Sequence, residues 1–111
     1  MESALLQLAE ETAARNRLTL AVEKLSQHPP APLNERVITA VEAAADDLGL
    51  SHTRLPSFAG HDTQVLSAIT PSAMFFVPSV GGISHHPREL THPQDIINGA
   101  NTLLGGVLKF M

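Results

Sequence analysis

The chain has 111 residues, the length of one domain, and an apolar fraction of 43% that suffices for a hydrophobic core. It contains no cysteine, which excludes disulfides and thiolate metal sites and fits a cytoplasmic protein. The net charge of -4 and the lack of a basic block argue against nucleic acid as a partner. The N-terminus has no basic region, so no signal peptide is expected, and no apolar run reaches the roughly 18 residues of a membrane span.

The first third of the chain predicts a helix, a strand and a connector. Residues 3 to 16 have the apolar spacing of a helix, with Glu10 and Glu11 on a solvated face. Residues 18 to 22 alternate as a strand does. Residues 29 to 32 read Pro-Pro-Ala-Pro, which predicts a stiff connector and a domain boundary.

The remaining residues predict an α/β fold in the order α-β-α-β-α, with parallel strands. Asn34 is suited to cap a helix, and Gly49 is suited to follow its end. Residues 53 to 55 predict a short strand. The apolar run from residue 73 to residue 77 suits a fully buried parallel strand.

Two further helices complete this order. Asp62 is placed to cap a helix that Pro71 ends. Pro93 suits the first turn of the last helix. The core face of that helix is expected to consist of Ile96, Ala100, Leu103 and Val107.

The loop from residue 57 to residue 62 has the composition of a carboxylate site. Gly60 lets the backbone approach a ligand closely, and the N-terminus of the following helix favours an anion. His61 adds a hydrogen-bond donor. The spacing leaves an alternative equally open, namely a turn with a capping Asp62 and an incidental histidine.

A second loop, residues 81 to 87, contains two adjacent histidines that are candidate metal ligands. Neutral imidazole is the commonest side-chain ligand, but a zinc site needs three or four ligands. His85 and His86 are alternative ligands here. Glu89 is either an acceptor for the second ring nitrogen of a ligated histidine or a solvated carboxylate.

Both loops follow predicted parallel strands, so they are expected to emerge on the same rim of a sheet. Adjacent strands lie about 4.8 Å apart. We therefore expect His61 and His85 to face one small-molecule site. Three other histidines stand at element boundaries and are expected at the surface: His28, His52 and His92.

Four ordered motifs carry a resemblance to a known family. They are Ala59-Gly60-His61-Asp62, the run from Pro71 to Ser79, the segment from Gly82 to His85 with Pro87 and Glu89, and the segment from Asp95 to Ala100. In these motifs the chain resembles the zinc-dependent N-carbamoyl-L-amino-acid hydrolases and allantoate amidohydrolases, with β-ureidopropionase as a close relative. They belong to the di-zinc aminoacylase and carboxypeptidase superfamily.

The resemblance implies two domains and a homodimeric enzyme. Residues 1–28 look like the end of an inserted lid and dimerisation domain, and residues 29–33 like a connector. Residues 34–111 look like the C-terminal part of an α/β zinc-hydrolase catalytic domain. The chain would thus correspond to roughly the C-terminal quarter of such an enzyme.

The resemblance also implies the roles of three residues. His85 matches the family's last zinc ligand, for zinc or manganese, and Gly60 and His61 match positions that hold the substrate's carboxylate. The other ligands and the general-base glutamate come earlier in the family, so no catalytic residue is expected in this chain. Phe58 and His86 depart from the family, which usually has glycine and serine there.

The expected function is hydrolysis of the carbamoyl or ureido C–N bond of N-carbamoyl amino acids or allantoate, with the isolated chain inactive. In the whole enzyme, a zinc-activated water and a glutamate base would carry out the reaction. An aminoacylase or peptidase of the same superfamily is an alternative within this class. An alternative from another class is a non-catalytic binding or interaction module. Exposed apolar surface is expected to favour a homo-oligomer.

Overall fold

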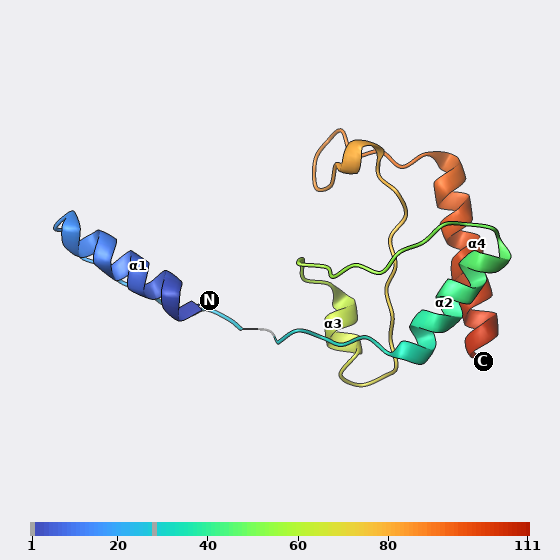
Figure 1. The fold of residues 1–111 in the computed structure, drawn as a ribbon, viewed down its shortest axis with the longest axis horizontal. Helices are drawn as coiled ribbons and strands as arrows, with labels where there is room; N and C mark the ends of the chain where they lie inside the picture. Colours follow the sequence, from blue (N-terminus) through green and yellow to red (C-terminus); the bar gives the residue numbers. More distant parts are fainter. Residues whose placement is uncertain (1, 28) are drawn as a thin grey trace.

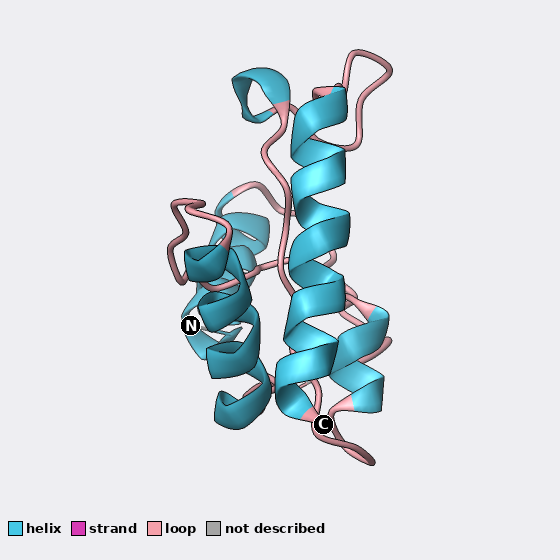
Figure 2. Ribbon diagram, turned by 90° about the vertical axis from the view of Figure 1, so that its right-hand side faces the viewer, coloured by secondary structure: helices cyan, strands magenta, loops and turns pink. Residues whose placement is uncertain are grey.

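The computed structural model describes residues 2–27 and 29–111, and each structural statement below refers to them. They form four α-helices and one short 3-10 helix (Figure 1). No strand occurs among these described residues, and Figure 2 accordingly shows only helices and loops. No helix found there is both long enough and apolar enough to cross a membrane. The elements are α1 (Glu2–Arg15), α2 (Glu35–Asp47), α3 (Asp62–Leu66), η1 (Val80–Gly82) and α4 (Pro93–Phe110).

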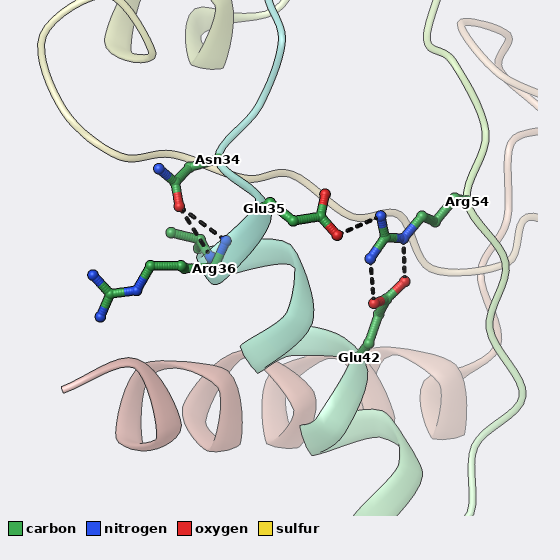
Figure 3. Close-up of polar contacts among 6 residues, drawn as sticks. Asn34, Glu35, Arg36, Glu42 and Arg54 are labelled. Carbon is green, nitrogen blue, oxygen red and sulfur yellow. Dashed lines mark hydrogen bonds and ion pairs between the residues drawn. The ribbon is translucent and has the colours of Figure 1, made fainter.

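Local signals set the ends of α2 and α4 as the sequence predicts. Asn34 Oδ1 accepts hydrogen bonds from the backbone N–H groups of Arg36 and Val37, at 3.1 and 3.3 Å, and so caps α2 (Figure 3). Gly49 lies just beyond α2 with a φ of 66°, a conformation that favours glycine. Pro93 is the first residue of α4, where its missing N–H costs no hydrogen bond.

The short helix α3 differs from its prediction at both ends. Its N-cap is His61, with a φ of -137° and a ψ of 150°, and Asp62 is already helical. The prediction of Asp62 as the cap is therefore wrong, because the extended residue stands one position earlier. The helix ends at Leu66, and hydrogen-bonded turns continue to Thr70 before Pro71.

Helices α2 and α4 pack against each other and are the one pair of elements in contact within the described residues. Their contact is made by small side chains, which let the two backbones come close. A Cβ atom added to Gly105 would lie 2.9 Å from the Ala44 Cβ, and one added to Gly106 would lie 3.0 Å from a Val41 methyl group. Ordinary helix pairs lie about 8–10 Å apart, and glycine at the contact favours the short end of that range.

This packing overturns the predicted core face of α4. The buried residues of α4 are Thr102 and Gly106, on the side that meets α2. The apolar residues predicted to be buried are all exposed, because the structure turns the glycine-bearing side of the helix toward α2. They are Ile96, Ala100, Leu103 and Val107.

Three predicted strands are wrong for this structure. Residues 18–22, 53–55 and 73–77 lie outside any helix, but none of them forms a ladder with another segment of the described chain. A strand is defined by its hydrogen-bonded neighbour, and these segments have none. The α/β fold class is therefore borne out in its helices and not in its sheet.

Helix α1 forms an arm that projects away from the other helices (Figure 1). The predicted helix is present, and Glu10 and Glu11 are exposed as expected. The chain returns beside α1, where the Lys24 Nζ atom lies 2.8 Å from a Glu2 carboxylate oxygen. Such an exposed ion pair stabilises little, so the arm has almost no packing support.

The length and apolar content predicted one domain with its own core, but only a small core forms. The radius of gyration is 19.9 Å, against about 13 Å for a compact domain of roughly 100 residues. The accessible surface is 9178 Å², against about 5,900 Å² expected for a folded chain of this mass. The buried apolar residues are Ala40, Ala44 and Ala45.

Candidate functional site

The first histidine loop holds its imidazole through a serine. Ser57 Oγ lies 2.8 Å from His61 Nε2, and Ser57 Oγ also accepts the Ala59 N–H at 3.4 Å. The His61 ring packs on Phe76, with 5.5 Å between ring centroids. His61 Nδ1 makes no hydrogen bond to the described residues, so it is available to a ligand oxygen.

Gly60 is exposed, and its role is not explained by this chain alone. A Cβ atom built there would meet no heavy atom within 4 Å, and its φ is not positive. The packing around residue 60 would therefore accept a side chain. Close approach of a ligand backbone or carboxylate stays a prediction for this position.

The second histidine loop is closed by backbone bonds. The Val80 N–H donates to the Leu90 carbonyl at 2.8 Å, which brings the two ends of the loop together. Gly81 and Gly82 have φ values of 67° and 66°, where glycine avoids the strain of a Cβ atom. The two ends of the loop are therefore held next to each other.

His85 is held in a left-handed backbone conformation with a φ of 55°. A non-glycine residue pays about 1–2 kcal/mol for this conformation, and such strain often marks functional sites. The His85 N–H donates to a Glu89 carboxylate oxygen at 2.7 Å, and the Glu89 N–H donates to the His86 carbonyl at 2.8 Å. Glu89 thus accepts from the backbone of His85 and not from its ring.

The rings of the two adjacent histidines have different neighbours. Ser84 Oγ lies 2.9 Å from His85 Nδ1, and no described residue bonds His85 Nε2. His86 Nδ1 instead accepts the Arg88 N–H at 3.1 Å. A neutral His86 that accepts through Nδ1 carries its proton on Nε2, so neither ring nitrogen is free to bind a metal. This geometry favours His85 over His86 as a ligand.

The described residues contain no ready-made metal centre. No three side chains of His, Cys, Asp or Glu come together within residues 2–27 and 29–111. A zinc site needs three or four ligands, so His85 fits as one ligand among others that this part of the chain does not supply.

A groove of about 1040 Å³ lies between the two extended segments, residues 51–57 and 73–78. Ser57 and His61 line it, together with residues of α2 and α4. No residue from 79 to 91 lines it, so His85 is outside the groove. The expected meeting of His61 and His85 at one site stays a prediction.

An arginine with two carboxylate partners holds the first extended segment against α2 (Figure 3). Arg54 bonds both carboxylate oxygens of Glu42, at 2.6 and 2.7 Å, and reaches Glu35 at 2.7 Å. The hydrogen bond from Arg54 lowers the pKa of Glu42, and these bonds raise the pKa of Arg54 above its ordinary value. A second contact joins the same segment to α2, where His52 Nε2 lies 3.0 Å from an Asp46 carboxylate oxygen.

The sequence analysis missed the hydrogen-bond partners of the candidate histidines. Ser57 and Ser84 were each one to four residues from a candidate histidine, and Arg54 faced a helix with Glu35 and Glu42 seven residues apart. That spacing puts both glutamates on one helix face, which was an available signal. His52 and His92 are exposed as predicted, and the expectation for His28 lies outside the described residues.

The sequence profile of the peptidase family M20/M25/M40 matches residues 4–109. Ureidoglycolate hydrolase of Arabidopsis thaliana is 36% identical over 96 residues, which are 86% of this chain and 20% of that protein. Allantoate amidohydrolase of Escherichia coli (strain K12) is 35% identical over 74 residues, 67% of this chain and 18% of that protein. N-carbamoyl-L-amino acid amidohydrolase of Geobacillus stearothermophilus is 38% identical over 95 residues, 86% of this chain and 23% of that protein.

A solved structure shares the arrangement of the elements. The crystal structure of a Burkholderia cenocepacia protein, assigned as an amidohydrolase/peptidase, matches with a TM-score of 0.76 and 36% identity. The match covers 98% of this chain and 27% of that one. The chain thus spans about a fifth of the length of the curated relatives and about a quarter of the solved neighbour.

Proposed function

Since this chain belongs to the peptidase family M20/M25/M40, we propose that it forms part of a metal-dependent amidohydrolase. The bond cleaved is the carbamoyl or ureido C–N bond of an N-carbamoyl amino acid or of allantoate. Relatives named for allantoate, ureidoglycolate and N-carbamoyl-L-amino acids support this substrate class. The observation that carries the proposal is His85, fixed in a strained conformation inside the motif that resembles the family's metal-binding segment.

We assign His85 the role of one metal ligand. Glu89 holds its backbone, and Ser84 engages Nδ1, so Nε2 is left to point at a metal ion. A partner on the second ring nitrogen commonly orients a ligating histidine. A zinc or manganese ion bound there would supply a Lewis acid for the scissile carbonyl.

We assign Gly60 and His61 to the substrate's carboxylate. Ser57 engages His61 Nε2, and Phe76 supports the ring, so Nδ1 can donate a hydrogen bond to a carboxylate oxygen. A hydrogen bond to an ionised carboxylate is charge-assisted and is roughly twice as strong as a neutral one. This contact would orient the substrate without touching the metal.

The domain assignment remains part of the proposal. Residues 1–28 are assigned to the end of a lid and dimerisation domain, residues 29–33 to a connector, and residues 34–111 to the catalytic domain. The separation of α1 from the other helices supports the first boundary. The homodimer is inferred from the resemblance, and the cytoplasmic location is proposed from the cysteine-free sequence.

A chimeric enzyme tests the proposal. In the N-carbamoyl-L-amino acid amidohydrolase of Geobacillus stearothermophilus, the matched 95 residues are replaced by those of this chain. We expect the chimera to release ammonia from N-carbamoyl amino acids or allantoate with added Zn²⁺ or Mn²⁺, and the isolated 111-residue chain to release none.

Two results would contradict this proposal. Turnover by the isolated chain that is lost on His85→Ala would show that the described residues suffice for catalysis. A chimera that folds as the parent enzyme does and binds metal, yet hydrolyses no carbamoyl, ureido, acyl or peptide substrate, would favour a non-catalytic module.

A further inference from the structure

We propose that Ser57 is a nucleophile, activated by His61 as its general base, that accepts acyl groups from esters of small carboxylic acids. This reaction proceeds on the two side chains and uses no metal ion, so it is an activity separate from the hydrolysis of a C–N bond. The inference rests on the contacts of residues 57–61 and of Phe76, and not on the proposed function.

The first argument is the direction of the hydrogen bond between the two side chains. Ser57 Oγ accepts the Ala59 N–H at 3.4 Å and lies 2.8 Å from His61 Nε2. Nε2 is the one acceptor that the described residues offer to the Ser57 hydroxyl hydrogen, so the hydroxyl donates to it. A neutral imidazole that accepts through Nε2 carries its proton on Nδ1. The Nε2 lone pair is therefore placed to take up the hydroxyl proton.

The second argument is that a third group orients the base. The His61 ring packs on Phe76, with 5.5 Å between the ring centroids and 58° between the ring planes. A nucleophile and a base within hydrogen-bond reach, with the base held by a third group, are the signature of an activated nucleophile. In a complete Ser–His–Asp triad the third group is a carboxylate on Nδ1. Here an aromatic ring orients the base instead, so we expect a slower reaction than that of a complete triad.

The third argument is access to the hydroxyl group. Ser57 is exposed, and it lines the groove of about 1040 Å³ together with His61. Leu55 and Phe76 line the same groove and are 62% and 57% exposed. Small-molecule sites combine such apolar side chains with a few polar groups. An uncharged ester with a small acyl group suits this surface, because its hydrocarbon part can contact the apolar side chains while its carbonyl carbon meets Oγ.

The reaction consists of two steps. In the first, a lone pair of Ser57 Oγ forms a bond to the acyl carbon, and the hydroxyl proton passes to His61 Nε2. The C–O bond to the alcohol breaks, and the leaving oxygen keeps the bonding pair and takes the proton from Nε2. In the second, water attacks the acyl carbon and gives a proton to Nε2, and the ester bond breaks as Oγ recovers that proton.

Two other serines of the chain serve as internal comparisons. Ser51 is exposed and lines the same groove, but the neighbouring imidazole of His52 engages Asp46 instead. Ser84 Oγ lies 2.9 Å from His85 Nδ1, but the His85 ring makes no aromatic contact within the described residues. The first serine thus lacks a base, and the second lacks the group that orients its base.

Labelling with phenylmethanesulfonyl fluoride tests the proposal on the 111-residue chain in the presence of a metal chelator. Oγ forms a bond to sulfur, the S–F bond breaks, fluoride leaves and the hydroxyl proton passes to the base. We expect Ser57 to be labelled at least about 100-fold faster than Ser51, because a general base contributes about 10²–10⁴ in rate. It should be labelled at least about tenfold faster than Ser84, whose base is not held by a third group. Mass spectrometry of the peptides locates the label.

Three variants separate the nucleophile, the base and the background. Ser57→Ala should lower the release of p-nitrophenol from p-nitrophenyl acetate at least about tenfold, because the acyl acceptor is lost. His61→Gln keeps an acceptor oxygen for the serine hydroxyl but cannot take up its proton, so labelling of Ser57 should fall at least about 100-fold. Ser51→Ala should leave both measurements unchanged.

Three outcomes would overturn the proposal. A Ser57 that stays unlabelled, or is labelled no faster than Ser51 and Ser84, would show that its contact with His61 only holds the loop. Labelling of Ser57 that persists in His61→Gln would exclude the imidazole as the base. Labelling that occurs only without the chelator would assign the reactivity to a bound metal ion.

Discussion

The two histidine loops follow similar extended segments, yet they are held in different ways. The loop with His85 is closed on itself by Val80, Leu90 and Glu89, and it strains the backbone of its histidine. The loop with His61 has no such closure and relies on Ser57 and a ring contact. Rigid placement suits a metal ligand, whose distance tolerance is a few tenths of an ångström, whereas a substrate contact tolerates more movement.

The largest difference between the loops should appear when each histidine is removed. In the active chimera, His85→Ala should lower the metal content and reduce turnover at least about 1000-fold, because a ligand is lost. His61→Ala should keep the metal and reduce kcat/KM by about 10- to 100-fold, because one hydrogen bond to a charged group is lost. Elemental analysis and steady-state kinetics measure both effects.

The matched control for this experiment is His86→Ala, next to the proposed ligand. It should retain metal and activity, because its ring serves only a local turn. Equal loss of metal from the His85 and His61 variants would show that the two roles have been divided wrongly.

The next effect concerns the closure of the second loop. Glu89→Ala removes the acceptor of the His85 N–H, so the left-handed conformation loses its support. Metal affinity should fall by about 10- to 100-fold, as it does when such supporting groups are removed elsewhere. Glu89→Gln keeps an acceptor oxygen and should restore most of the affinity in a metal titration. If both variants bind metal as tightly as the unchanged chimera, Glu89 does not position His85.

A smaller effect is expected in the first loop. Ser57→Ala removes the partner of His61 Nε2 but leaves Phe76 to support the ring. KM for a substrate with a free carboxylate should rise about three- to tenfold, for a lost bond of roughly 0.5–1.5 kcal/mol. kcat should stay within twofold. A fall in kcat with an unchanged KM would place the serine in the chemical step.

The smallest effect is a pH dependence of the segment that leads into the first loop. The hydrogen bond from Arg54 lowers the pKa of Glu42. At a pH above its ordinary pKa, the ionised Glu42 therefore stabilises the contact that holds residues 51–57 against α2. This contribution is lost as the pH falls through the lowered pKa, since a protonated Glu42 no longer pairs with Arg54. Arg54 is exposed and Glu42 is only half-buried, so solvent screens the pair and the effect is small.

Nuclear magnetic resonance of the 111-residue chain measures this effect. The Arg54 Nε–H signal should lose its exchange protection as the pH falls below the ordinary pKa of a glutamate, about 4.3. In Glu42→Gln the signal should be unprotected both above and below this pH. The same pH dependence in that variant would assign the change to another group.

The features that were predicted correctly from the sequence are those that local interactions determine. The cap at Asn34, the positive φ at Gly49 and the start of α4 at Pro93 each depend on a few neighbouring residues. The predicted strands at residues 53–55 and 73–77 do not form, because an extended segment becomes a strand only beside a hydrogen-bonded partner, which the local sequence does not reveal.

The buried face of α4 and the serine partners of the histidines escaped prediction for a related reason. Apolar spacing selected Ile96 and Leu103, but the contact with α2 selects the face with Gly105 and Gly106, where backbones come closest. His61 and His85 were identified from motifs, whereas Ser57 and Ser84 became visible only from atomic positions.

The hydrogen bond between the Val80 N–H and the Leu90 carbonyl has a consequence for how this protein can change over time. Since this hydrogen bond joins the two ends of the loop, the residues between them can vary in length or composition without moving α4. Residues 81–89 therefore behave as a cassette, comparable to an Ω-loop, that recombination can exchange as a unit. Transplanted between relatives, the cassette would carry its histidine and its supporting glutamate together.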